Sequence, residues 1–472
     1  MIRFLPLIFF LVFLSCQSER SSSEAVILSG QIVNPTNEYV VLYKNDQVVD
    51  SARLDENNRF NFTLLDIDEG LHHFDHNPEQ QYVFLEKGDS MLIRLNTMAF
   101  DESLVFSGTN EQVNNFMIEM FLNYEDEEQL IQSFYKLSPK EFDFKIDSLR
   151  EQKIEELHNL IIGEDLSSNA YAMARATIDY NSYIYKEKYP FYHKKSSNES
   201  ILHALDSSFY DYRSKLDFNN AELAFFRPYY EFMINHFGNL SYMSCQNNCK
   251  SMIKGGENKH LHLNKHKIQL IDSLVENKDL RDNLFRNVAV DYLLNIHKID
   301  GDTYTFIDKF HKLSNNSGHK NEIVQLFTAI EELQENKSLP NIIVQNAEGQ
   351  SVTLKSISKQ HTTVFYFWTA SRKRHFRNVT RRLSKLKQDY PDHQFVGISL
   401  KTGKKQWASL IKEQGLNEHE QFWGGDFDKI QQTLLIDNLN KCVIAKDSII
   451  VDGFANIFKS FQPKTQKALA VN

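Results

Sequence analysis

Two cysteines and two histidines stand at a spacing that suits either a disulfide or a metal site. Cys245 and Cys249 are separated by three residues, twelve residues lie between Cys249 and His262, and three more lie between His262 and His266. Two thiolates and two imidazoles at such spacing can bind zinc. Against zinc, Lys259 stands where a finger core needs an apolar residue. The favoured interpretation is a local Cys245–Cys249 disulfide, and free thiols are a third possibility.

A basic run stands near the start of an expected helix. Arg372, Arg374, His375 and Arg377 lie within six residues, and Lys373 adds a further cation. Cations are disfavoured at a helix N-terminus by the helix dipole. The run is therefore either a solvated or docking face, or an anion site in which free N–H groups and guanidinium groups hold a phosphate or carboxylate.

The N-terminus has the pattern of a lipoprotein signal peptide. Arg3 precedes an apolar run over residues 4–14 that is too short to span a bilayer. The sequence Leu-Ser-Cys that ends at Cys16 resembles a lipobox, in which the cysteine becomes lipidated. Gln17 after that cysteine suits the outer membrane. We expect a protein of the cell envelope, anchored to the membrane through Cys16.

The charge is unevenly distributed along the chain. The net charge is −9, from 53 basic and 62 acidic residues, but residues 336–472 hold 21 basic and 11 acidic residues. That segment therefore carries +10 and the remainder −19. The contrast favours docking of the basic segment on the acidic remainder or on an anionic partner. No nucleic-acid motif is present, so nucleic acid is not expected as a partner.

Periodicity divides the rest of the chain into a β segment and a helical segment. Residues 25–108 alternate in strand fashion between turn sequences. Residues 109–335 have helical spacing, including runs over 223–237 and 268–294. Pro228 should break or kink the first of these runs. The tyrosine-rich stretch at 180–192 is more consistent with core than with a ligand surface.

The last segment alternates strands and helices. An apolar and aromatic strand over residues 363–368 is its most strongly buried element. The expected elements are a hairpin over 342–354, this strand, a helix over 371–389, a strand over 395–399, a helix around Trp407, a short helix after Asp428, strands over 442–445 and 449–453, and a final helix.

This order, with the strand that ends in Phe-Trp, resembles the TlpA/ResA-like and AhpC/TSA-type thioredoxin-fold proteins over residues 336–472. In that family the strand is followed by Trp-Cys-x-x-Cys, whose first thiol is activated at a helix N-terminus. Here Ser371 stands at the tryptophan position, and Arg372 and His375 stand at the two cysteine positions. The family also places a cis-proline before its penultimate strand, and residues 437–441 contain no proline. The resemblance thus implies the fold without the dithiol chemistry. We also expect Ser371 to cap the helix.

The β segment is similar to the small β-sandwich that precedes thioredoxin domains in many envelope lipoproteins of Gram-negative bacteria. The expected fold class is therefore multidomain α+β, ending in a thioredoxin-like α/β domain. The expected divisions are a signal peptide (1–15), a tether (16–24), a β-sandwich (25–108), a helical domain (109–335) and a thioredoxin-like domain (336–472).

The sequence is consistent with three functions. The first is a redox-inactive binding or scaffold protein with no cofactor, whose partner is an envelope protein or an anionic ligand. The second is a thiol–disulfide oxidoreductase that uses Cys245 and Cys249, or Cys442, in place of the usual pair. The third and weakest is metal binding through Cys245, Cys249, His262 and His266.

Overall fold

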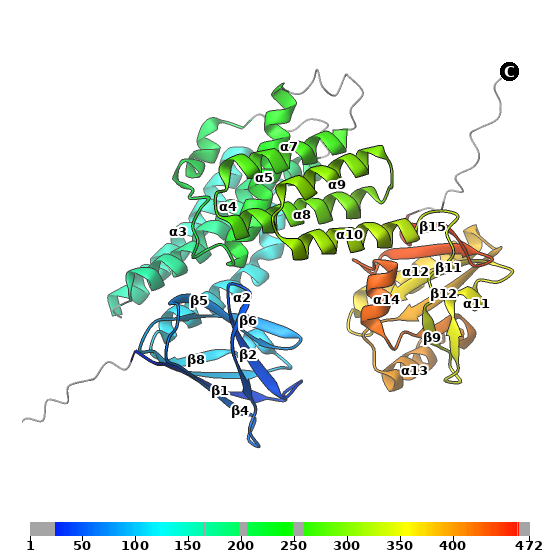
Figure 1. Ribbon diagram of the computed structural model, residues 1–472, viewed down its shortest axis with the longest axis horizontal. Helices are drawn as coiled ribbons and strands as arrows, with labels where there is room; N and C mark the ends of the chain where they lie inside the picture. Colours follow the sequence, from blue (N-terminus) through cyan, green and yellow to red (C-terminus); the bar gives the residue numbers. More distant parts are fainter. Residues whose placement is uncertain (1–23, 164–165, 198–204, 249–258, 460, 462–472) are drawn as a thin grey trace, which may run out of the picture. The chain divides into compact units, whose positions relative to one another are not determined.

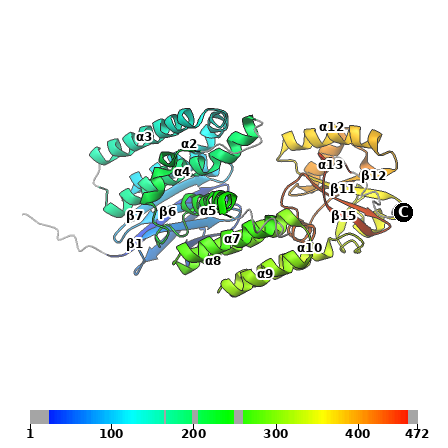
Figure 2. The same cartoon turned by 90° about the horizontal axis from the view of Figure 1, so that it is seen from above.

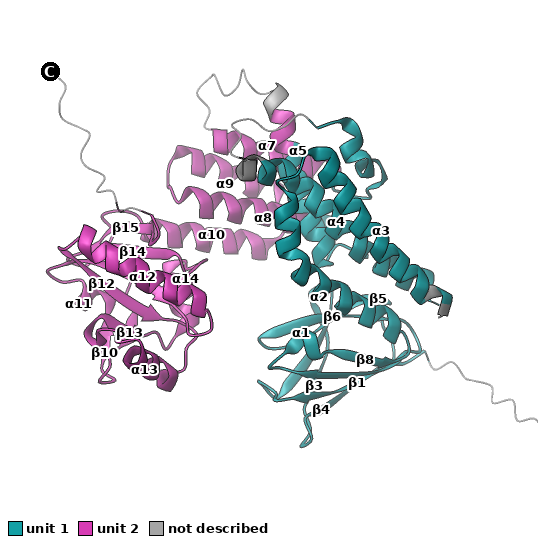
Figure 3. Ribbon diagram, turned by 180° about the vertical axis from the view of Figure 1, so that it is seen from behind, with its two compact units in different colours: residues 1–240, 275–280 teal, residues 241–274, 281–472 magenta. Residues whose placement is uncertain are grey.

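The computed structural model describes residues 24–163, 166–197, 205–248, 259–459 and 461. The chain falls into two compact units, coloured separately in Figure 3. Unit 1 comprises residues 1–240 and 275–280, and unit 2 comprises residues 241–274 and 281–472. The helical segment expected as one domain is therefore divided between them. The signal peptide and Cys16 lie outside the described residues. None of the helices in the described ranges is both long and apolar enough to cross a bilayer.

Unit 1 begins with a β-sandwich of two four-stranded sheets, ordered β4-β1-β7-β8 and β3-β2-β5-β6. Alternate side chains of β1, β4 and β7 are buried between the sheets, as β4 shows with Phe60, Phe62 and Leu64 buried and their neighbours exposed. The alternation in the sequence predicted these strands. The strands are β1 (Val26–Val33), β2 (Tyr39–Lys44), β3 (Gln47–Arg53), β4 (Arg59–Leu64), β5 (Gly70–His76), β6 (Glu79–Leu85), β7 (Ser90–Asn96) and β8 (Val105–Gly108).

Helices of unit 1 pack against one another and against the sandwich (Figure 1). Ile118 of α2 belongs to the sandwich core, and the buried Asn114 side chain hydrogen-bonds both the N–H and the C=O of Phe84 on β6. The helix α2 is thereby fixed to that strand. The elements are α1 (Phe100–Ser103), α2 (Glu111–Phe134), α3 (Pro139–Gly163), α4 (Ser168–Ser197), the 3-10 helix η1 (Ser207–Lys215) and α5 (Arg227–Asn248).

A buried ionic cluster joins three of these elements. Glu187 of α4 is completely buried and accepts hydrogen bonds from Arg213 and Tyr212 of η1. Nδ1 of His236 on α5 lies 2.7 Å from the same carboxylate. Burial alone would raise the pKa of Glu187, but the hydrogen bonds and charges of His236 and Arg213 outweigh it and lower the pKa. The cluster holds η1 between the two helices.

The tyrosine-rich stretch lies on α4 and contributes to the helical core, as predicted. Tyr189 is fully buried, lies 4.3 Å from the Phe142 ring, and donates a hydrogen bond to the Leu137 carbonyl. Tyr192 stacks on Tyr135 but is 37% exposed. The stretch therefore acts chiefly in packing.

Two expected helices have different limits in the structure. The predicted helix over 223–237 begins only at Arg227, because Pro228 fits the first turn, where its missing N–H costs nothing. The predicted run over 268–294 is two helices. Asn277 interrupts it, because its side chain accepts a hydrogen bond from the N–H of Leu280 and starts α8. The helices here are α7 (Lys259–Leu274), α8 (Lys278–Ile296), α9 (Gly301–Leu313) and α10 (Ser317–Glu332).

Unit 2 contains a seven-stranded sheet, which we call the C-terminal sheet, in the order β10-β9-β13-β12-β11-β14-β15. The inner strand β11 is parallel to β12 and antiparallel to β14. Its elements are β9 (Ile343–Gln345), β10 (Ser351–Thr353), α11 (Leu354–Ile357), β11 (Thr362–Trp368), α12 (Lys373–Asp389), β12 (His393–Ser399), α13 (Lys404–Glu413), η2 (Glu418–Glu420), β13 (Gln421–Trp423), α14 (Phe427–Leu434), β14 (Lys441–Lys446) and β15 (Ile449–Asn456).

Helices cover both faces of the C-terminal sheet, which is the reason β11 reads as a continuous apolar run. Alternate residues of β11 enter two cores: one shared with α12 and α13, the other shared with α14. Figure 2 shows α12 and α13 on one side of the strands. The prediction of mixed helix and sheet is confirmed, and so are the expected strands in this segment. The short strand β13 was not predicted, and the expected final helix falls largely outside the described residues.

Candidate functional site

The start of α12 is placed by the buried strand that precedes it. Six consecutive residues of β11 are buried up to Trp368. The Trp368 indole donates a hydrogen bond to the Gln421 side chain at 3.1 Å, and its ring lies 4.7 Å from that of Phe376 in the first turn of α12. The strand and the helix are therefore packed together at the point where the chain turns between them.

The expected cap by Ser371 is wrong. The helix begins at Lys373, so the cap position belongs to Arg372, whose side chain makes no capping hydrogen bond. The Ser371 hydroxyl instead lies 3.2 Å from that of Thr369. The Ala370 N–H donates a hydrogen bond to the Thr402 hydroxyl at 3.1 Å, which fixes the turn before the helix.

As a result, the first turn of α12 is strongly cationic and lacks side-chain capping. Arg372, Lys373, Arg374 and Arg377 are exposed, and no acidic residue stands in the first turn. Along the described chain no carboxylate forms an ion pair with any of these four residues. Helix N–H groups and guanidinium groups are thus both directed to solvent here, which is an arrangement that favours an anion.

His375 takes the inner position of this turn. It is half-buried and lies edge-on to the Phe458 ring at 6.1 Å. Burial lowers its pKa; hydrogen-bonding groups of Asn440 and Leu439 oppose that shift, while the charge of Arg372 adds to it. The structure therefore brings His375 beside the stretch over 437–441, where the resemblance implies a cis-proline. Arg374 and Arg377 are exposed.

The cysteines give no support for a substitute nucleophile among the described residues. Cys442 lies on β14 and is fully buried, and burial raises its pKa far above the ordinary value. Since the thiolate is the attacking species, such a thiol is inert. Cys245 of α5 is buried as well, with 3% of its surface exposed.

The proposed disulfide and zinc site depend on Cys249, which lies outside the described residues. His262 and His266 stack along α7 with ring centroids 6.5 Å apart, and Nε2 of His266 lies 2.9 Å from the Ser244 hydroxyl, next to Cys245. Burial, followed by the charge of His262, lowers the pKa of His266. Within the described ranges no three His, Cys, Asp or Glu side chains are placed to hold a metal ion.

Sequence reasoning missed a buried lysine on the opposite face of β14. Lys441 is 6% exposed; its ammonium group donates to the Leu435 carbonyl at 3.1 Å and lies 4.2 Å from the Phe454 ring centroid. Burial lowers its pKa to about 7, although Asp437 and Asp452 act in the other direction. The apolar residues at 442–445 indicated a buried strand. Lys441 is the first residue of that strand, where the sequence pattern does not indicate burial.

Among known proteins, neither a family model nor a curated protein matches the chain. The chain is similar to the thioredoxin domain of a thiol-disulfide oxidoreductase from Bacteroides vulgatus, at 19% identity, over 25% of this chain and 87% of that one, with a TM-score of 0.23. A thiol:disulfide interchange protein from Bacteroides sp. is 20% identical over 26% of this chain and 81% of its own, with a TM-score of 0.23. A thioredoxin-like protein from Bacteroides caccae is 11% identical over 54% of this chain and 94% of its own, with a TM-score of 0.32. At these identities the likeness is one of fold alone.

Proposed function

We propose that this chain is a thioredoxin-like protein of the cell envelope that has lost dithiol catalysis and works by binding. One observation carries the proposal: the two positions at the start of α12 where the resemblance implies thiols hold Arg372 and His375. The inert environment of Cys442 supports it further, because no other described thiol lies open at the C-terminal sheet.

The insulin-reduction assay tests the loss of catalysis. The purified chain and a Cys442→Ser variant are mixed with insulin and dithiothreitol, and precipitation of the insulin B chain is followed by turbidity. We expect both proteins to match the uncatalysed rate. Turnover by the wild type that Cys442→Ser abolishes would overturn the proposal in favour of an oxidoreductase.

The binding surface that we propose is the cationic first turn of α12, with an anionic group as its ligand. Arg372, Arg374, His375 and Arg377 would surround the anion together with the free helix N–H groups. Each charge-assisted contact of this kind contributes roughly 1.5–3 kcal/mol. A phosphate titration at fixed ionic strength, with the melting temperature as readout, tests this surface. Phosphate should stabilise the wild type more than Arg372→Ala, and equal shifts would contradict the anion site.

The envelope location is a proposal that rests on the lipobox-like sequence before Cys16. Lipidation there would tether the chain to the membrane, with the outer membrane as the expected one. A Cys16→Ala variant should then leave the membrane fraction or stay unprocessed, whereas unchanged fractionation with intact processing would contradict the anchor.

A further inference from the structure

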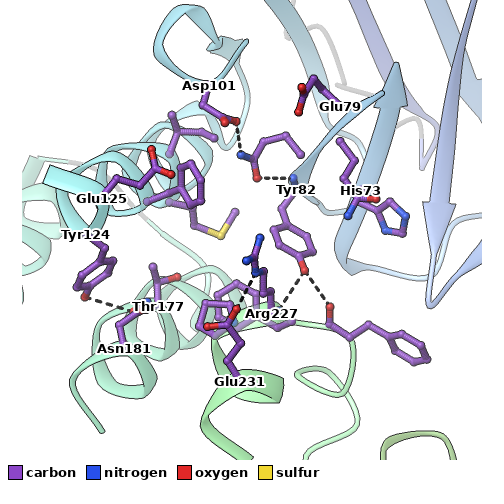
Figure 4. Close-up of a pocket in the computed structure, with 18 of the residues that line it drawn as sticks. His73, Glu79, Tyr82, Asp101, Tyr124, Glu125, Thr177, Asn181, Arg227 and Glu231 are labelled. Carbon is purple, nitrogen blue, oxygen red and sulfur yellow. Dashed lines mark hydrogen bonds and ion pairs between the residues drawn. The ribbon is translucent and has the colours of Figure 1, made fainter. Parts of the chain in front are cut away.

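Unit 1 contains a cavity of about 680 Å³. Its walls come from both the sandwich and the helices: Tyr82 and Gln81 from β6, His73 from β5, and residues of α2, α4 and α5. Figure 4 shows these side chains around the Tyr82 ring. Its size is that of a pocket for a small molecule or a few residues of peptide.

The interior of the cavity is aromatic and already ordered. Tyr82 lies edge-on to Phe226, with ring centroids 5.7 Å apart. Its hydroxyl donates to the Phe225 carbonyl at 3.1 Å and accepts from the Arg227 N–H at 3.0 Å. Because two hydrogen bonds hold the hydroxyl and Phe226 packs against the ring, the position of the aromatic surface is set before any ligand enters. Further aromatic and apolar lining comes from Met117, Phe121 and Tyr124.

Carboxylates surround this aromatic interior. Four of them, Glu79, Asp101, Glu125 and Glu231, are visible around Tyr82 in Figure 4. The full acidic set of the lining is Asp46, Glu79, Asp101, Glu125, Glu128 and Glu231.

The cations in the lining do not balance these charges. The guanidinium of Arg227 lies 2.9 Å from Glu231 and is used in that ion pair. Burial lowers the pKa of His73, so its ring adds no positive charge near neutral pH. The lining therefore retains a large negative excess.

Asp101 illustrates why a cation would gain by entering. Its carboxylate is partly buried and accepts a hydrogen bond of 2.8 Å from the Gln81 amide. Burial raises its pKa because it penalises the charged form, and the hydrogen bond from Gln81 opposes that shift. A positive group of a ligand would stabilise the charged form.

A metal ion does not fit this pattern. Nowhere in the described part of the chain do three His, Cys, Asp or Glu side chains converge to ligate one ion. The carboxylates are spread around an aromatic floor instead. Such an arrangement suits a cation with an apolar body, because aromatic faces attract ammonium and guanidinium groups and also bury aliphatic or aromatic carbon.

We propose that this cavity binds a short basic peptide segment, with its ammonium or guanidinium groups at the carboxylate rim and an apolar side chain on Tyr82 and Phe226. The site lies in unit 1 and is separate from the cationic turn of α12, so the two proposals stand or fall independently. The charge complementarity and the aromatic floor together select this ligand class.

Isothermal titration of the full chain with the tripeptide amide Lys-Phe-Lys tests the proposal. The double variant Glu125→Gln/Asp101→Asn should bind the peptide roughly tenfold more weakly, as expected for the loss of at least one charge-assisted contact. Glu119→Gln is the matched control, because Glu119 is an exposed carboxylate of the same helix that does not line the cavity. It should leave the affinity unchanged. Circular dichroism verifies that each variant is folded.

Two further probes separate the parts of the ligand. The peptide in which norleucine replaces both lysines lacks their ammonium groups and should bind much more weakly than Lys-Phe-Lys. Spermidine, a cation without an aromatic group, should also bind much more weakly than Lys-Phe-Lys. Equal binding of the norleucine peptide, or equal affinity of the double variant and wild type, would overturn the proposal. Spermidine binding as tightly as the tripeptide would overturn the peptide assignment, and failure of the tripeptide to bind at millimolar concentration would overturn the site.

Discussion

Lys441 makes a testable contribution to stability through its buried ammonium group. Its pKa is lowered from 10.5 to about 7 by burial, so between these values the unfolded chain holds a proton that the folded chain lacks. Stability must then rise with pH across this window, and the burial penalty is fully present below pH 7. We expect Lys441→Met to reduce the slope of this rise, to which burial of Lys267 also contributes by lowering the pKa of that lysine. The measurement is the urea midpoint at several pH values, followed by tryptophan fluorescence, since all three tryptophans lie in the C-terminal sheet or its helices.

The control for this prediction is Lys446→Met, which removes an exposed lysine from the same strand. That variant should keep the wild-type slope. If the Lys441→Met curve keeps the wild-type slope between pH 7 and about 10, the low pKa of Lys441 does not contribute to that slope.

The positions of single residues could be predicted where neighbouring residues in the sequence mark the end of a strand. The Phe-Trp end of β11 placed Arg372 and His375 correctly at the start of α12. The role of Lys441 was not predictable in this way, because its burial depends on Phe454 and Leu435, which fold onto it from other elements. The acidic lining of the unit 1 cavity was hidden for the same reason: its residues come from elements between residues 46 and 231.

At the scale of elements, strands and long helices were predicted well and their ends less so. Alternation and buried runs indicate strands directly, as in β4 and β11. Caps depend on single hydrogen bonds: Thr402 fixes Ala370 and displaces the start of α12 past Ser371, and Asn277 divides a continuous apolar pattern into two helices. The three-residue strand β13 is too short to show a period.

The ionic cluster around Glu187 is the interaction between elements with the clearest expected cost. Removal of the carboxylate by Glu187→Ala leaves Arg213 and the buried His236 without their shared acceptor. Breaking a buried pair on one side costs roughly 3–5 kcal/mol. We therefore expect a large fall in the urea midpoint measured by far-ultraviolet circular dichroism.

The matched control is Glu151→Ala, which removes an exposed partner of Arg150. Its expected cost is about 1 kcal/mol or less, since water screens exposed pairs. Equal effects of the two variants would show that the Glu187 cluster adds no more stability than a surface ion pair.

At the scale of the whole molecule, the two units carry sites of opposite charge. The C-terminal sheet has the strand order and flanking helices that place the start of α12 at a sheet edge, yet the side chains there are cationic. The acidic remainder of the chain supplies the opposite property in the unit 1 cavity. Each surface is thus suited to recognition, one of an anion and the other of a basic segment.

Introducing a thiol pair at the start of α12 tests the proposed loss of dithiol catalysis most directly. In the double variant Arg372→Cys/His375→Cys, the two introduced thiols stand at the first turn of α12, three positions apart, where the dipole favours a thiolate. We predict that they form an intramolecular disulfide under mild oxidation, seen by mass spectrometry, and that the reduced form reacts with small disulfides faster than wild type does. The Arg374→Cys/Arg377→Cys variant, with the same spacing on the exposed face, should react more slowly. Redox turnover by the wild type, or no difference between the two double variants, would contradict the account.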